Sequence, residues 1–551
     1  MILFKFQKNI LVFFYKILPH FTIKLQRRFT DMITNTPEII TKVKHFQTKV
    51  SEYLSGTLEN LKPYSSIMGI YKEGSKNSYM IRPRFPGGIA TLEQLQAIAN
   101  IANKYSLRLR FTTRQDLQLH AVPLEKVNII LDNLLQVGLI TTGAGGDGIR
   151  NITCSPLSGI ARDEIFDVTP YMIAITNFML RTTENLQLPR KYKVSFSNTA
   201  DDTANASISD LGFIAKKENN KLGFCVYAAG GLGSNSQLAI KLSDFILAED
   251  ALFYVEAMKN IFAREGDRTN RNKARLRFVR QRLGDEVFLT YFQQELHQLK
   301  LTNPELKLTL NPTTVATEDN SFFPWDKEYQ NIIFPQKQSG LYAIYIHPSK
   351  GEILPTQILT LTEFLKAVTP KVELRLTSSQ GFFVRNLSVK AVDQLLLLTD
   401  SLISPFSIDN TVSCAGPQFC NFGINDSQSL LTSILEFFKN QPLAIKSALP
   451  TPLISGCPNS CAQHQKGLIG FTGRKKRLEG KIVDTYLLSL GGRVGYQAKF
   501  GENIGEILAT RIPAFLLELA ILKAQYPSIS FSEFLEQQHL QILNLTKAYL
   551  L

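Results

Sequence analysis

Four of the six cysteines in this 551-residue chain fall into two close pairs. Five residues separate Cys414 from Cys420, and three separate Cys457 from Cys461. The pairs are 36 residues apart and glycine and proline flank both, so short turns can bring four sulfurs to one centre. Four thiolates are the usual ligand set of an iron-sulfur cluster. The pattern therefore predicts a redox protein.

Basic side chains inside apolar, strand-like segments form a second candidate site. Lys191 and Lys193 are two residues apart in an alternating segment, which places both ammonium groups on one face of a strand. Arg190 adds a neighbouring cation, and Arg82 and Arg150 lie in two other apolar segments. We expect these cations to form a pocket for a small oxyanion.

Other arginines suit larger anions. Arg108 and Arg110 alternate with leucines, and a guanidinium group binds a carboxylate or phosphate through two hydrogen bonds. A denser basic cluster spans residues 264–277 and includes Arg275. This cluster fits either a polyanion site or an exposed basic helix, and the sequence leaves both open.

Composition limits the class of protein. The net charge is +14, of which residues 1–34 supply six basic and one acidic side chain. The basic residues lack the aromatic stripes of a nucleic-acid binder, so we expect no nucleic acid partner. No segment approaches the roughly 20 apolar residues that cross a bilayer. Cysteines that serve metal rather than disulfides indicate a reducing compartment, and we expect a cytoplasmic protein.

The chain contains a repeat. Residues 107–115 and 117–122 match residues 372–380 and 382–387, at an offset of 265 residues. Each copy alternates as two strands around a polar turn, with a helix-like segment on either side: 92–105 and 124–137 in the first, 359–368 and 389–402 in the second. Downstream, Arg150–Cys154 matches Asn410–Cys414 and Gly230–Gly233 matches Gly491–Gly495. In this alignment Lys191 and Lys193 correspond to the region of Cys457 and Cys461.

The repeat predicts an α+β fold, a duplicated module with pseudo-twofold symmetry and one site between its halves. We place the two small α+β units, here called half-domains, at residues 62–138 and 326–403, and larger α/β domains at 139–325 and 404–551. Residues 1–61 are then an N-terminal extension. Its first 34 residues are a targeting segment, a membrane-touching helix or the product of a mis-assigned start.

Over residues 62–525 the chain resembles the siroheme-dependent sulfite and nitrite reductases. The resemblance rests on the cysteine pairs and on further motifs in the same order: Arg82 before Phe-Pro-Gly-Gly, Thr113-Arg-Gln115, Arg150-Asn151, Leu188–Lys193 and Asn272–Arg275. The duplicated architecture is also that of this family. The resemblance implies that the two half-domains are ferredoxin-like and that the two larger domains bind siroheme and the cluster. The chain departs from the family pattern at Gly145–Gly148, where several relatives have cysteines.

The resemblance implies siroheme and a 4Fe-4S cluster as cofactors. Cys414, Cys420, Cys457 and Cys461 would hold the cluster, and Cys461 would bridge it to the siroheme iron. Arg110, Arg114 and Arg275 would contact the eight siroheme carboxylates. In the distal pocket, Arg82, Arg150, Lys191 and Lys193 would hold the substrate and assist proton delivery.

The implied reaction is an assimilatory six-electron reduction of sulfite to sulfide. Lys193 favours sulfite, because plant-type nitrite reductases have asparagine there. The cysteine motifs resemble the nitrite branch, so reduction of nitrite to ammonia is the alternative. An electron carrier without enzymatic activity and a related monooxygenase of corrinoid synthesis are further alternatives. No flavin or NADPH domain is evident, so a separate donor is needed, ferredoxin or a flavoprotein.

Overall fold

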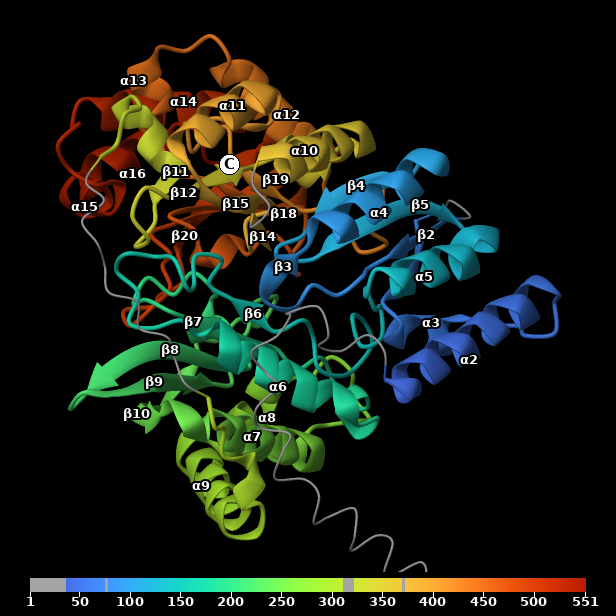
Figure 1. The fold of residues 1–551 in the computed structure, drawn as a ribbon. Helices are drawn as coiled ribbons and strands as arrows, with labels where there is room; N and C mark the ends of the chain where they lie inside the picture. Colours follow the sequence, from blue (N-terminus) through green and yellow to red (C-terminus); the bar gives the residue numbers. More distant parts are fainter. Residues whose placement is uncertain (1–35, 75–77, 311–321, 369–371) are drawn as a thin grey trace, which may run out of the picture.

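The computed structural model describes residues 36–74, 78–310, 322–368 and 372–551, and the predictions for residues 1–34 fall outside this range. In the described residues the strands form four sheets of five strands each. Two of the sheets belong to the half-domains and two to the larger domains (Figure 1). The predicted α+β class with a duplicated architecture is confirmed.

The two half-domain sheets have the same strand order. The first contains, in spatial order, β1 (Ile70–Glu73), β2 (Ser78–Ile81), β5 (Leu117–Pro123), β4 (Arg108–Phe111) and β13 (Glu352–Ile353). The second contains β11 (Ile333–Pro335), β12 (Tyr342–Ile346), β15 (Phe382–Leu387), β14 (Glu373–Leu376) and β3 (Ile89–Ala90). The helices of the first are α3 (Lys62–Ile67), α4 (Leu92–Lys104) and α5 (Val127–Gln136), and those of the second are α10 (Pro355–Val368) and α11 (Val389–Leu398).

Each half-domain gives one short strand to the other. Strand β3 pairs with β14 through Ala90 and Leu374, and β13 pairs with β4 through Ile353 and Leu109. In Figure 1 the blue strand β3 lies beside β14 of the other half-domain. Buried side chains from both half-domains also belong to one hydrophobic cluster. The pair therefore folds around a shared core.

Helix α2 (Pro37–Leu54) packs against α5 of the first half-domain. Val43, Phe46 and Val50 bury their side chains in the shared core, and the Gln47 amide donates to the Asn128 carbonyl at 3.0 Å. This part of the predicted N-terminal extension therefore packs onto the first half-domain.

The larger domains repeat a second topology. One sheet contains β10 (Ile240–Leu247), β9 (Lys221–Ala228), β8 (Leu211–Glu218), β7 (Val194–Ser197) and β6 (Thr153–Cys154). The other contains β16 (Val412–Ser413), β17 (Leu453–Ser455), β18 (Ile469–Leu478), β19 (Lys481–Leu490) and β20 (Glu502–Leu508). Helices α6 (Thr169–Arg181), α7 (Ala251–Glu265), α8 (Leu276–Leu283) and α9 (Asp285–Thr302) accompany the first sheet. Helices α12 (Ser427–Phe438), α13 (Leu443–Lys446), α14 (Ile512–Ala524), α15 (Phe531–Gln537) and α16 (His539–Lys547) accompany the second.

The strand pairing confirms one predicted alignment and corrects another. Leu109 pairs with Leu119 as Leu374 pairs with Val384, which confirms the offset of 265 residues in the half-domains. In the larger domains, Thr153 pairs with Ser195 as Val412 pairs with Leu453. Thr153 therefore matches Val412, and the counterpart of Cys414 is Ser155 rather than Cys154.

The predicted equivalence of the lysines with the second cysteine pair is wrong. Ser195 and Leu453 occupy equivalent positions in the two sheets, because Ser195 pairs with Gly212 of the next strand as Leu453 pairs with Gly470. Lys193 comes two residues before Ser195, whereas Cys457 comes four residues after Leu453. The lysines therefore precede their strand and the cysteines follow theirs, at opposite ends of matching strands.

No helix within the described ranges is both long and apolar enough to cross a membrane.

Candidate active site

The two cysteine pairs lie on loops that follow adjacent parallel strands. Cys414 follows β16, and Cys457 and Cys461 follow β17. Two polar groups contact the Cys414 sulfur: the Gly456 N–H donates to it at 3.1 Å, and the Ser427 hydroxyl lies at 3.1 Å. The Ser427 hydroxyl also donates to the Cys414 carbonyl at 3.1 Å, so these contacts fix the position of the residue. The fold thus brings the predicted cluster ligands to one sheet end.

The four thiols act on one another electrostatically. Burial, and then Cys414, raise the pKa of Cys461 to about 11, with Cys420 and Cys457 acting in the same direction and Lys191 opposing them. Over the described residues, no three His, Cys, Asp or Glu side chains are close enough to hold a single metal ion. A four-iron cluster is a larger body that takes one thiolate at each iron. Four neighbouring thiols match the number of ligands that such a cluster takes.

Cys461 lies close to the cations of the site. Lys191 acts on its thiol electrostatically, and Arg275 and Arg150 act in turn on Lys191. Cys461 is exposed, and Lys191, Lys193 and Arg150 are half-buried. A predicted cluster ligand and the predicted substrate-binding cations are therefore neighbours.

The turn between β4 and β5 connects the first half-domain with the cluster loops. The Thr113 hydroxyl donates to the Cys461 carbonyl at 2.7 Å, and the Arg110 guanidinium donates to the Ser413 carbonyl at 2.9 Å. Gln115 has a positive φ of 57°, and its side-chain oxygen accepts a hydrogen bond from the Cys154 N–H at 2.9 Å. Its counterpart Gln380 accepts from the N–H of Ser413, next to Cys414, at 3.0 Å. Matching side chains thus fix both halves of the site.

A buried carboxylate organises the cations at the start of β7. Asp210 is fully buried, and both its oxygens accept from the Arg275 guanidinium at 2.9 Å. The same carboxylate accepts from the backbone N–H of Lys193 at 2.9 Å. Asp210 therefore fixes the positions of Arg275, a predicted siroheme contact, and of Lys193, a predicted substrate contact. The sequence alone did not indicate this role.

Arg82 and Arg150 converge on one backbone carbonyl. Both guanidinium groups donate to the oxygen of Ala144, at 3.1 and 2.7 Å, and Arg150 also donates to the Gly146 carbonyl at 2.8 Å. Burial lowers the pKa of Arg150. The segment around Gly145–Gly148 thus has a role that requires no cysteine side chain, because the Ala144 and Gly146 carbonyls orient Arg82 and Arg150.

A hydrogen-bonded chain supports Arg82 from behind. With the Gln118 amide oxygen toward Arg82, that oxygen accepts from Nη2 at 2.6 Å and from Nε at 2.9 Å. The amide nitrogen then donates to His120 Nε2 at 3.2 Å, and His120 Nδ1 lies 2.5 Å from Glu73 Oε1. One arrangement satisfies every member, with His120 neutral and protonated on Nδ1. Arg82 is therefore preorganised.

Positive charge in the site is poorly compensated. Burial, and then Arg275 and Arg150, lower the pKa of Lys191 to about 7. Burial, followed by Arg114 and Lys191, lowers the pKa of Lys193 well below its usual value. An anionic ligand would restore the charged form of both lysines.

Unpaired guanidinium groups test the fit of a polyanionic cofactor. Seven arginines have buried N–H groups without a partner among the described residues, and three of these, Arg84, Arg375 and Arg385, are not among the predicted cofactor contacts or their neighbours. The other four belong to the site or adjoin it: Arg110 (Nη1), Arg114 (Nε), Arg275 (Nε) and Arg277 (Nε and Nη1). Burial lowers the pKa of Arg114 to about 9. Leaving such donors unpaired is costly, and carboxylates are their natural partners. The donor set therefore fits the carboxylate-rich rim of siroheme.

Some cations of the sequence analysis have other partners. Arg190 and Arg271 both pair with Asp147, at 2.7 and 2.5 Å. Arg108 is exposed, pairs with Glu352 at 2.6 Å and lies over the Phe419 ring. Residues 264–277 form no continuous basic helix, because α7 ends at Glu265 and α8 begins at Leu276. From this cluster, the site takes Arg275 and Arg277.

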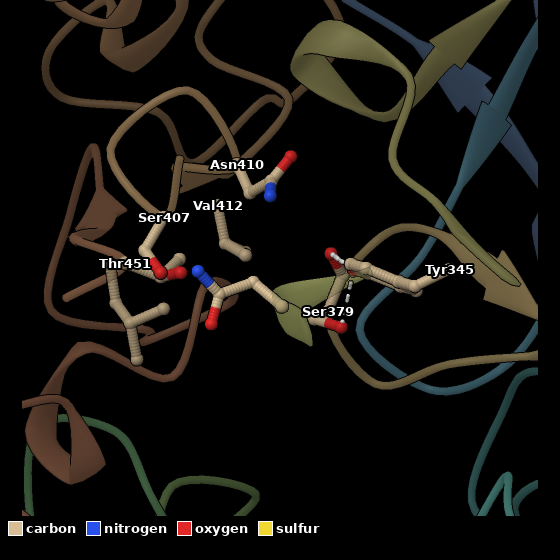
Figure 2. A pocket seen from close by; sticks show the side chains of 8 residues that line it. Tyr345, Ser379, Ser407, Asn410, Val412 and Thr451 are labelled. Carbon is tan, nitrogen blue, oxygen red and sulfur yellow. Dashed lines mark hydrogen bonds between the residues drawn. The ribbon is translucent and has the colours of Figure 1, made fainter. Parts of the chain in front are cut away.

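The second half has a neutral cavity at the matching place (Figure 2). It encloses about 270 Å³, and its lining is Asn331, Tyr345, Ser379, Ser407, Asn410, Val412, Thr451 and Leu453. By the alignments above, Ser379 corresponds to Arg114 and Thr451 to Lys193. At these two positions the duplication kept cations on one side only, which predicts a single anion site.

Fold and site together define an oxidoreductase with an iron-sulfur centre beside an anion pocket. The family described as "Nitrite/Sulfite reductase ferredoxin-like half domain" matches residues 71–137, and "Nitrite and sulphite reductase 4Fe-4S domain" matches residues 145–300. The second match covers the copy that carries the cations.

Curated relatives support the same grouping. Ferredoxin-nitrite reductase of Synechococcus elongatus is 31% identical over 80% of this chain and 86% of its own length. Sulfite reductase [ferredoxin] 1 of Mycolicibacterium paratuberculosis is 27% identical over 77% of this chain and 75% of its own length. The solved structure of Mycobacterium tuberculosis NirA has the same fold, with a TM-score of 0.73, 23% identity and coverage of 86% of this chain and 90% of that one.

The chain belongs to the nitrite and sulfite reductase family. It is an oxidoreductase, and the cofactors of the family are siroheme and a 4Fe-4S cluster.

Proposed function

We propose that this enzyme reduces sulfite to sulfide, with nitrite reduction to ammonia as the alternative. Lys193 carries the proposal. It adds an enclosed cation to Lys191, Arg82 and Arg150, and the neighbouring charges that act on it are mostly positive. A dianion gains more from each added cation than a monoanion does. Sulfite therefore suits this pocket better than nitrite.

The relatives supply the argument for the alternative. The S. elongatus protein, with 31% identity, is a ferredoxin-nitrite reductase, whereas the M. paratuberculosis sulfite reductase has 27%. These identities are close to each other, so overall similarity discriminates less than the composition of the pocket.

The proposed division of labour follows from the site. Bound siroheme would supply an iron for the anion's sulfur or nitrogen atom, and the cluster held by the cysteines would supply electrons one at a time. Arg110, Arg114 and Arg275 would hold siroheme carboxylates, and Cys461 would join the two cofactors. Arg82, Arg150, Lys191 and Lys193 would hold the anion, stabilise charge on its oxygens and assist protonation.

The electron donor that we propose is ferredoxin, on which the nitrite reductase relatives depend by name. A flavoprotein is the alternative donor. The described chain contributes the cofactor site and the anion pocket, and the donor would deliver electrons to the cluster.

Turnover with reduced methyl viologen tests the substrate. We expect a higher kcat/KM for sulfite than for nitrite. Lys193→Asn should lower sulfite turnover at least about tenfold and nitrite turnover much less, because the dianion gains more from the extra positive charge. Lys241→Asn, which removes an exposed lysine paired with Asp244, is the matched control. Equal losses on the two anions would contradict sulfite as the substrate.

A further inference from the structure

A tyrosine hydroxyl lies among the distal cations. Tyr71 is on β1, and its oxygen accepts from the Gly146 N–H at 2.8 Å. The positive charges of Arg150 and Arg82 also act on this hydroxyl. Tyr71 therefore shares its surroundings with two of the four residues proposed to hold the anion.

The contacts leave the phenolic proton available. A tyrosine oxygen accepts about two hydrogen bonds and donates one. The Gly146 N–H fills one acceptor position, and across the described residues no acceptor for the Tyr71 proton is found. Burial alone would raise the pKa of Tyr71, but Arg150, Arg82 and the Gly146 N–H outweigh it and the pKa is lowered. The hydroxyl is thus a strengthened acid with a free proton.

The local sequence makes room for this hydroxyl. A Cβ atom at Gly145 would lie 2.4 Å from the Tyr71 oxygen and 2.2 Å from the Ser66 carbonyl, so only glycine fits. In the second half-domain the matching residue is Phe334, because Phe334 pairs with Ala343 as Tyr71 pairs with Met80. The hydroxyl is present on the cation side, and its counterpart on the neutral side lacks it.

We propose that Tyr71 is a further catalytic residue, which gives its proton to an oxygen of the anion held by Arg82, Arg150, Lys191 and Lys193. The inference rests on the proposed function only in requiring an oxyanion there. The phenolic O–H bond breaks and a bond forms between that proton and the substrate oxygen. A second proton from solvent completes the water that leaves, and solvent also returns the proton to the tyrosine. The electrons come from the external donor, so Tyr71 is neither oxidised nor reduced. Arg150 and the Gly146 N–H stabilise the transient phenolate.

Tyr71→Phe tests the proposal, and the natural Phe334 indicates that this strand position tolerates phenylalanine. Tyr345→Phe is the matched control, because it removes a buried phenol that bonds Ser379 at 2.8 Å in the neutral cavity. Three quantities are measured for each holoenzyme: the siroheme Soret band, the Kd for sulfite and nitrite from the shift of that band, and kcat with reduced methyl viologen.

In Tyr71→Phe we expect an unchanged Soret band, Kd values within about threefold and a fall in kcat of roughly a hundredfold, with a changed solvent isotope effect. Tyr345→Phe should match the wild type. Unchanged kcat, or a Kd that rises as far as kcat falls, would overturn proton donation by Tyr71. The wild-type preference between sulfite and nitrite judges the proposed function separately, because the comparison of Tyr71→Phe with the wild type is made on either anion.

Discussion

Cys461 is the residue at which the two parts of the site meet. Its carbonyl accepts from Thr113 of the first half, and Lys191 opposes the rise that burial causes in the pKa of its thiol. The other three cysteines lie within electrostatic reach of it. Its place between the other cysteines and Lys191 suits a ligand shared between the cluster and the siroheme iron.

Cys461→Ser should therefore remove the coupled cofactors. A serine oxygen is a poor substitute for a soft thiolate at iron. We expect loss of the combined absorption and electron paramagnetic resonance signals of cluster and siroheme, together with viologen-driven turnover. Cys225→Ser, at a buried cysteine of β9 outside the site, should keep both. A Cys461→Ser enzyme with normal spectra and turnover would refute the bridging role.

At the scale of elements, the exchanged strands hold the two half-domains together. Strands β3 and β13 have only two residues each, yet each closes the edge of the other half-domain's sheet. Gly88 precedes β3 with a positive φ of 75°, and a Cβ there would lie 2.2 Å from the Leu376 carbonyl of β14. The segment at Gly88 and strand β14 approach so closely that only glycine is accommodated.

Gly88→Ala should therefore destabilise the second half-domain from a site in the first. Strain and displacement of β3 should cost about 2–4 kcal/mol. The single tryptophan, Trp325, packs on Tyr342 of β12 and donates to Asp393, so its fluorescence reports unfolding of the second half-domain. We expect a lower urea midpoint by this signal. Gly56→Ala has a similar φ of 80° but open space around it, and should cost only about 1 kcal/mol. Equal midpoints for the two variants would show that the exchanged strand contributes nothing.

At the scale of the molecule, sequence reasoning succeeded where the signal is periodic or compositional. Alternating strands predicted the half-domain repeat with its correct offset, and the cysteine spacing predicted that four thiols come together. Strands of two residues carry no period, so the exchange of β3 and β13 was not predictable. The alignment of Ser195 with Leu453 depends on pairing between strands that are far apart in the sequence. Loops of unequal length between these strands concealed the alignment. Asp210 and Tyr71 were missed because single polar residues give no pattern; only the fold brings them to the cations.

The net charge of the whole molecule allows the identity of the electron donor to be tested. The net charge is +14, and an acidic ferredoxin would be drawn to such a surface by forces that salt screens over about 10 Å at 0.1 M. With sulfite saturating, ferredoxin-driven kcat/KM should fall roughly tenfold as ionic strength rises from low to moderate values. Turnover driven by methyl viologen needs no docking, so it should change little, which controls for effects of salt on the anion pocket. A parallel decline with both donors would locate the salt effect in the pocket. Salt-independent turnover with ferredoxin, or faster turnover with a flavoprotein, would instead contradict ferredoxin as the donor.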